Sequence, residues 1–195
     1  GKIIDRGNHE NINISTSNNE KWLAIDTDDL GKNIVAINSI QIHISKDSGS
    51  TFGKMTDNVL PNNATYINTT ISGDGEQIII IAKSGENKKL WITRRTDGFD
   101  VNSNFSKFEE ITNNDNNFIN EWEFVKSSEN GSYIVASTTD GQVWLSSDYG
   151  NSWEKIKSFS DNSINDISIG IDDTNNQLYI VVAEKKNLWS YIINI

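Results

Sequence analysis

The side chains in this sequence that could do chemistry are mainly carboxylates. Six of them stand near segments that we expect to form inner β-strands: Glu20, Asp26, Asp28, Asp29, Glu121 and Glu123. Two carboxyl groups held about 5 to 9 Å apart across a sugar would perform glycoside hydrolysis. The spacing along the chain pairs no two of them, and acidic residues in turns are usually solvated turn-formers. The sequence therefore names no catalytic residue, and a carboxylate pair remains an alternative.

Metal-binding and nucleophilic side chains form no recognisable site. The chain has no cysteine and only two histidines, His9 and His43. We expect His9 in a polar N-terminal loop and His43 as a half-exposed structural ring. Residues 26–31 lack the alternating acidic positions and the final glutamate of a calcium loop. The sequence therefore predicts no metal site and no cofactor, although an ion held by backbone carbonyls alone would leave no trace in it.

Three aromatic residues are the candidate ligand-binding patch. Trp22, Tyr66 and Trp122 begin apolar segments that we expect to be the innermost strands of a repeated unit. Aromatic side chains commonly line ligand pockets, and sugar rings stack on them where they are exposed. Packing in the core is the alternative for each residue.

A short turn motif occurs twice in equivalent contexts. Residues 45–52 and 146–153 both read Ser-x-Asp-x-Gly-x-Ser/Thr-Phe/Trp, and each follows a short alternating strand. Ser and Asp side chains accept hydrogen bonds from N–H groups of their own turn, and glycine takes a positive φ. The aromatic residue can fold back over the turn. All of the shared positions are therefore expected to be structural: Ser45, Asp47, Gly49, Phe52, Ser146, Asp148, Gly150 and Trp153.

This motif resembles the Asp-box, or BNR repeat, of sialidase-like and related β-propellers. The resemblance implies a β-propeller whose motif copies lie on the outer rim, away from any ligand. It does not extend to sialidase activity, which requires three convergent arginines, a Tyr/Glu nucleophilic pair and an acid–base Asp. This chain has only Arg6, Arg94 and Arg95, and the last two are consecutive. We therefore reject sialidase activity.

Further copies of the repeat surround the motif. One column holds Ala36, Ala82, Ala136 and Ala183, and a second holds His43, Trp91, Trp144 and Trp189, with spacings of 48, 53 and 45 residues. A turn signal precedes each alanine, and a short apolar segment precedes each turn. Each unit therefore reads as four short antiparallel strands, and units of this length are typical of propeller blades. For the tryptophans of the second column, we expect packing between blades.

The sequence predicts an all-β fold with one domain over residues 1–195. The domain is a small β-propeller of four blades with four antiparallel strands each, in units at residues 20–58, 63–110, 120–160 and 165–195. The last unit stops after its third strand, so we expect the apolar residues 2–6 to supply its outer strand and close the ring. Two alternatives stay open: a fifth degenerate blade in residues 8–20, and a half-ring that dimerises.

Composition excludes some partners. The net charge of −10 disfavours nucleic acid and anionic membranes. No segment reaches the ~18 continuous apolar residues of a membrane span. The sequence as given does not open with a basic, apolar leader, and a mature or trimmed form that begins at Gly1 stays open. The absence of cysteine leaves the compartment open. We expect a monomer that is secreted, on a cell surface or part of a virion rather than cytoplasmic.

A rigid ring that displays variable loops suits binding without chemistry. We therefore expect a non-catalytic recognition or scaffold module that binds glycan or protein through one face of the ring. The alternatives are a glycoside hydrolase with an unrecognised carboxylate pair and a structural component of a surface or particle.

Overall fold

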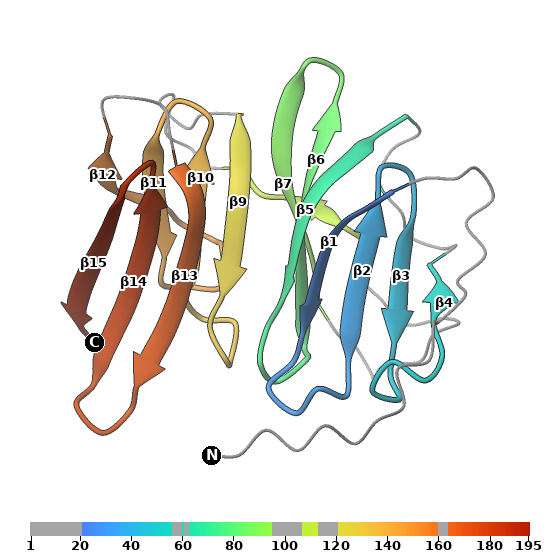
Figure 1. Ribbon diagram of the computed structural model, residues 1–195, viewed down its shortest axis with the longest axis horizontal. Coiled ribbons are helices and arrows are strands. Elements are labelled where there is room, and N and C mark those ends of the chain that lie inside the picture. Colours follow the sequence, from blue (N-terminus) through green and yellow to red (C-terminus); the bar gives the residue numbers. More distant parts are fainter. Residues whose placement is uncertain (1–20, 56–59, 61–62, 95–106, 113–120, 160–163) are drawn as a thin grey trace.

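The protein folds into a succession of small antiparallel sheets. The computed structural model describes residues 21–55, 60, 63–94, 107–112, 121–159 and 164–195. These residues form fifteen strands and no helix. Four sheets follow one another along the chain, three with four strands and one with three (Figure 1). The chain is an all-β, four-bladed β-propeller, as predicted.

Within each sheet the strands pair in chain order, so that each sheet is a meander. The first sheet comprises β1 (Trp22–Thr27), β2 (Ile34–Asn38), β3 (Ile42–Ser45) and β4 (Gly53–Lys54), and the second comprises β5 (Thr65–Ile71), β6 (Gln77–Ser84), β7 (Asn87–Arg94) and β8 (Glu109–Glu110). The third comprises β9 (Trp122–Ser127), β10 (Ile134–Thr138), β11 (Gln142–Ser146) and β12 (Glu154–Ser158), and the fourth comprises β13 (Ile164–Asp172), β14 (Gln177–Glu184) and β15 (Asn187–Asn194).

The fourth sheet has three strands among the described residues. The strand that the sequence predicts at residues 2–6, and the possible fifth blade in residues 8–20, lie outside the described part of the chain. Closure of the ring by the N-terminal segment therefore stays a prediction.

The core lies between consecutive sheets, in three apolar clusters. Each sheet turns one face, here called the preceding face, toward the sheet before it, and the other, the following face, toward the sheet after it. Strand β6 shows why its apolar residues run without interruption: Ile78 and Ile80 pack in the cluster with the first sheet, whereas Ile79 and Ile81 pack in the cluster with the third. A strand that is buried on both faces needs no polar alternation.

The tryptophan column packs between sheets. Trp91 pairs with Ile80 and is 8% exposed, and Trp144 pairs with Ala136 and is 4% exposed. Both lie on preceding faces, inside the clusters. The alanine column was out of line in two sheets: in the second, Ala82 lies two residues beyond Ile80, the partner of Trp91. In the fourth, Trp189 pairs with Val182, one residue before Ala183. Adjacent strand residues face opposite sides of a sheet, so this shift moves the alanine to the other face.

The first and fourth sheets are the ends of this row. Consecutive sheets pack through their first strands, β1 against β5, β5 against β9 and β9 against β13. Among the described strands, none of the first sheet packs extensively against one of the fourth. Figure 1 shows β1–β4 and β5–β8 to the right, and β9–β12 and β13–β15 to the left. Strand β1 and the pair β14–β15 consequently expose large apolar side chains.

Candidate functional site

Both copies of the turn motif adopt the same hydrogen-bonded structure. In the second copy, Ser146 Oγ accepts from Gly150 N at 2.9 Å and donates to Asp148 Oδ1 at 2.9 Å. The Asp148 carboxylate then accepts from Ser152 N at 2.8 Å and from Ser152 Oγ at 2.6 Å. Trp153 is 7% exposed and donates from Nε1 to Gly150 O at 3.2 Å, so it covers the turn.

The first copy repeats these bonds. Ser45 Oγ accepts from Gly49 N at 2.9 Å and donates to Asp47 Oδ1 at 2.8 Å, while Thr51 donates to both oxygens of Asp47 at 2.8 and 2.7 Å. Its aromatic residue, Phe52, is half-buried. The two turns are therefore the same local structure, built from residues of the same type.

Each of these turns has a second left-handed residue beside the glycine for which the motif predicts a positive φ. Gly49 and Gly150 have φ of 85° and 87°, but Ser48 and Tyr149 before them are also positive, at 58° and 62°. The N–H groups of Ser48 and Tyr149 point toward the inner part of their sheets. Ser48 N donates to Lys32 O, and Tyr149 N donates to Ser132 O, both at 3.1 Å. The motif thus fastens the outer hairpin to the turn between the first two strands.

The hydrogen bonds also explain the acidity of the two aspartates. Those that Thr51 donates hold the pKa of Asp47 below its usual value. Burial raises the pKa of Asp148, and the hydrogen bonds from Ser152 and Ser146 outweigh that effect and lower it. Groups that stay ionised in a closed set of local bonds suit a structural role.

The turns that follow the first strand of each sheet form a second repeated structure. In the first three sheets, the residue that opens this turn is Asp28, Ser72 or Ser128, and its side chain accepts a hydrogen bond from a backbone N–H later in the turn. The backbones of neighbouring turns also bond to each other: Asp29 N donates to Gly73 O at 3.0 Å, and Asp74 N donates to Glu129 O at 2.7 Å. These inner turns therefore form one connected row.

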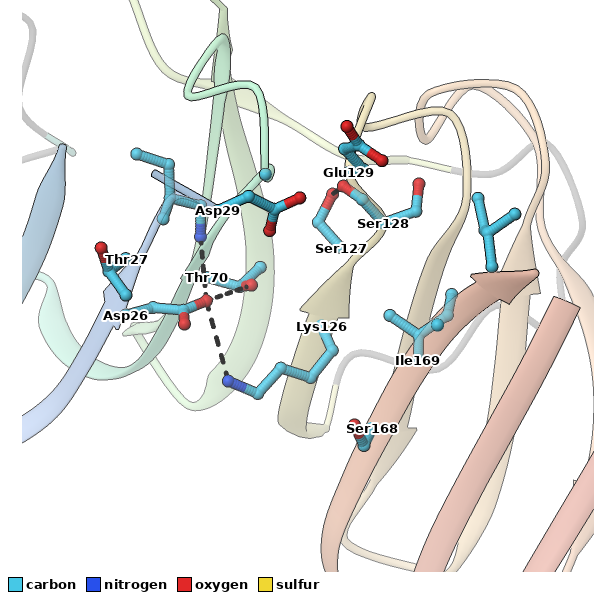
Figure 2. A pocket seen from close by; sticks show the side chains of 14 residues that line it. Asp26, Thr27, Asp29, Thr70, Lys126, Ser127, Ser128, Glu129, Ser168 and Ile169 are labelled. Carbon is cyan, nitrogen blue, oxygen red and sulfur yellow. Dashed lines mark hydrogen bonds and ion pairs between the residues drawn. The ribbon is translucent and has the colours of Figure 1, made fainter. Parts of the chain in front are cut away.

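A pocket of about 290 Å³ lies beside this row, where the first strands β1, β5, β9 and β13 of all four sheets meet. Its lining is mainly polar on the side of the first three sheets and includes Ile169 and Ile171 on the fourth. Figure 2 shows Asp26, Asp29, Lys126 and Glu129 around it. Three carboxylates and one ammonium group give the lining an excess of negative charge.

Asp26 is held in place by three partners from other strands. Its Oδ2 accepts from Thr70 Oγ1 at 2.7 Å and from Ile71 N at 3.2 Å, and it lies 3.7 Å from Lys126 Nζ (Figure 2). The ion pair is partly exposed, so it contributes little by itself. Asp26 therefore links β1, β5 and β9, which makes it a positioning residue of the pocket wall.

The predicted aromatic patch is not brought together. Trp22 is 44% exposed and contacts His43 edge to face, with ring centroids 5.2 Å apart. Tyr66 is 5% exposed, and burial raises the pKa of its hydroxyl. Trp122 is 1% exposed and packs on Trp144 and Trp153. Tyr66 and Trp122 thus pack in the core, which was the alternative expected for each of them. A ligand role stays a prediction, and of the three residues only Trp22 has enough exposed surface for it.

His43 is more buried than the half-exposed ring that we expected. It is 4% exposed, and its Nε2 lies 3.1 Å from Gln41 Oε1. Burial lowers the pKa of His43, and the nearby Lys54 lowers it further. Within the described residues, no group of three or more His, Asp or Glu side chains is arranged to hold a metal ion.

The candidate carboxylates separate into different environments. Asp26 and Asp29 line the pocket, whereas Asp28 is 4% exposed and accepts from Lys32 N and from Asn33 Nδ2 at 2.7 and 2.6 Å. Glu121 and Glu123 do not line the pocket, and Glu20 lies outside the described residues. Asp28 is therefore a turn-former, although a buried one.

Sequence reasoning missed Glu129 and Lys126 as pocket residues. The signal was present in the repeat: aligning the turns on Gly31 and Gly131 places Glu129 at the same position as Asp29. Lys126 carries no comparable signal, because its contact with Asp26 depends on how two sheets pack.

Comparison with solved structures finds β-propellers. YCF48 from Cyanidioschyzon merolae has a TM-score of 0.59 and 14% identity, and the match covers 93% of this chain and 59% of that one. YCF48 bound to D1 peptide has a TM-score of 0.57 at 13% identity, covering 90% and 55%. A chain of a nidogen/laminin complex has a TM-score of 0.58 at 10% identity, covering 90% and 61%. Such identities show the fold alone.

The chain spans roughly three fifths of the length of these structures. No family model matches it, and neither does any curated protein. None of the described residues belongs to a helix with the length and apolarity that a membrane span requires.

Proposed function

We propose that this chain is a non-catalytic recognition module that binds a protein partner at the pocket between the inner strands. The observation that carries the proposal is the pocket itself, because all four sheets contribute their first strand to it. Such a position depends on the whole fold, so a side chain inserted there would contact four sheets at once. Ligands of rigid scaffolds commonly bind where several elements converge.

The solved structures with a similar fold support a protein as the partner. One of them is a YCF48 bound to a D1 peptide, and another belongs to a complex of nidogen with laminin. Both are similar to this chain in fold only, so they support the class of ligand and not its identity. Glycan remains the other ligand class that the sequence left open.

Charge indicates which peptides fit. The pocket contains Asp29 and Glu129 in addition to Asp26, and the single ammonium group, Lys126, is already beside Asp26. The chain as a whole carries a net charge of −10. A partner segment with lysine or arginine would be attracted from a distance and could place its cation near the two carboxylates.

The two turn motifs contribute to this function as scaffold. We propose that they are Asp-boxes, on the evidence of their shared hydrogen bonds and paired positive-φ residues. None of their residues lines the pocket. Asp47 and Asp148 accept hydrogen bonds from donors within their own turns, which supports a structural role for them.

Binding of the full chain to an array of basic, neutral and acidic peptides tests the proposal. We expect basic peptides to bind most tightly, with an affinity that falls as salt rises. The double variant Asp29→Asn/Glu129→Gln should weaken binding by about tenfold, or roughly 1.4 kcal/mol. Asp173→Asn is the matched control, because Asp173 is exposed in the β13–β14 turn and does not line the pocket.

Two results would contradict the proposal. One is equal binding of acidic and basic peptides, and the other is an unchanged affinity for the double variant. A glycan array on the same protein separates the ligand classes, because selective glycan binding without peptide binding would support the carbohydrate alternative.

A further inference from the structure

One position of the repeat brings a residue of every described sheet to the pocket. It lies two residues before the residue that opens the inner turn, and all four of its occupants line the pocket: Asp26, Thr70, Lys126 and Gly170. The first three carry an acid, a hydroxyl and a base, whereas the glycine adds no side chain. Equivalent places in the fold therefore present complementary chemistry to one another.

The acid and the base at this position are already in contact. Asp26 Oδ2 accepts from Thr70 Oγ1 at 2.7 Å and lies 3.7 Å from Lys126 Nζ. The Thr70 hydroxyl and the Ile71 N–H hold this oxygen in place, and the ammonium group compensates its charge. Lys126 thus supplies, from within the chain, the cation that a ligand would otherwise bring to Asp26.

A second set of carboxylates lies three residues further along the chain, in the inner turns. Asp29 and Glu129 occupy equivalent places in the first and third sheets, and both are exposed. Asp29 lies against Gly73 of the second sheet, where a Cβ would come within 2.5 Å of its Oδ2. The absence of a side chain at Gly73 therefore gives this carboxylate its place. Figure 2 shows Asp29 and Glu129 above the ion pair.

The two sets of charges differ in what they offer to a ligand. Lys126 balances one of the three carboxylates in the lining, so two remain, both in the inner turns. Ile169 and Ile171 form the wall on the fourth sheet and suit the methylene groups of a lysine or arginine side chain. Among the lining residues, the carboxylate left for a second basic side chain is Asp26, which Lys126 already balances.

We propose that Lys126 is the specificity-determining residue of the pocket. By neutralising Asp26 it leaves Asp29 and Glu129 as the acceptors, and it restricts the partner to a segment that presents one basic side chain rather than several. A charge placed to disfavour the wrong ligand is a common source of specificity. This inference rests on the proposed function, the binding of a basic protein segment at this pocket.

The affinities of the full chain for two synthetic peptides test the inference. Both peptides have the same uncharged Gly/Ser background, one with a single lysine and one with two. Wild type should bind the two peptides within about threefold of each other, because the second lysine finds no unbalanced carboxylate. In Lys126→Gln the preference for the two-lysine peptide should rise by about tenfold, because Asp26 then lacks its cation. A gain of affinity of this kind cannot come from a damaged fold.

Three further variants separate this effect from other causes. Lys126→Arg keeps a cation beside Asp26, so it should keep the wild-type ratio of affinities. Lys83→Gln removes the same charge at an exposed residue of β6 that does not line the pocket, so it reports the general effect of net charge. Asp26→Asn leaves the Lys126 cation uncompensated, so it should weaken binding of the one-lysine peptide.

The outcomes distinguish this inference from the proposed function. If wild type binds the one-lysine peptide but Lys126→Gln keeps the wild-type ratio, the role of Lys126 is refuted and the proposed function stands. The same holds if Lys83→Gln raises the ratio equally, or if wild type already prefers the two-lysine peptide by about tenfold. If wild type binds neither peptide, the proposed function fails and this inference fails with it.

Discussion

At the scale of single residues, each copy of the turn motif is held together by hydrogen bonds among its own residues. Its serine, aspartate and glycine act within eight residues, so their contacts depend little on the rest of the fold. What could not be foreseen was the second positive-φ residue, Ser48 or Tyr149, since neither is a residue type that favours that conformation.

The glycine of the second motif should be hard to replace. Gly150→Val places a β-branched side chain at φ of 87°, with its Cβ 3.4 Å from the Cδ1 atoms of Ile111 and Ile134. We expect a loss of more than about 1 kcal/mol in urea denaturation. Gly170→Val is the control, because Gly170 lies in β13 with open space around it and no positive φ. Equal stabilities of the two variants would refute the account of the turn.

The aspartates of the motif should make stability depend on pH in acid. Their pKa values are lowered in the folded chain from a usual value of 3.8. A lowered folded-state pKa contributes stability that is fully present above 3.8 and is lost as pH falls through the folded-state value. The double variant Asp47→Asn/Asp148→Asn should therefore lose less stability between pH 5 and pH 2 than wild type does, measured as urea midpoints. A parallel pH dependence of both proteins would contradict this.

At the scale of strands and turns, the repeat predicted the sheets because short apolar segments separated by turn signals recur at the length of one sheet, even where a strand such as β6 is buried on both faces. The one-residue shift in the fourth sheet escaped it, because Ala183 and Val182 are both compatible with either face. The pocket escaped it too, since its lining comes from four separate strands and no contiguous segment carries the signal.

The contact between an amide and a glycine at neighbouring turns gives a prediction at this scale. Gly131→Ala places a Cβ against the Gln77 amide, whereas Gly85→Ala meets nothing within 4 Å. Both glycines have similar positive φ, 73° and 69°, so the backbone strain is matched. The first variant should be less stable by about 1 kcal/mol more than the second in thermal or urea unfolding. If the two variants melt together, the amide does not pack there tightly.

At the scale of the whole molecule, stability resides in the three clusters between sheets, and the number of sheets follows from the number of repeats. The sequence led to four units and to their order. Closure of the ring by residues 2–6 stays a prediction, since that segment lies outside the described residues.

Trp122 separates a core role from a ligand role. It is 1% exposed between the second and third sheets, in contact with Trp144 and Trp153. Trp122→Ala should lower the free energy of unfolding by about 3–5 kcal/mol and change the near-UV dichroism. Trp22→Ala, at a 44% exposed ring, should cost much less. If the Trp122 variant were as stable as the Trp22 variant, the cluster around Trp122, Trp144 and Trp153 would not be part of the stabilising core.

The backbone hydrogen bonds from Asp29 to Gly73 and from Asp74 to Glu129 also limit the changes in turn length that the fold can accept during evolution. An insertion or deletion in one inner turn would displace the donors and acceptors of its neighbours as well as its own. Differences in length among related sequences should therefore collect in the connections between sheets, where no such row has to stay aligned.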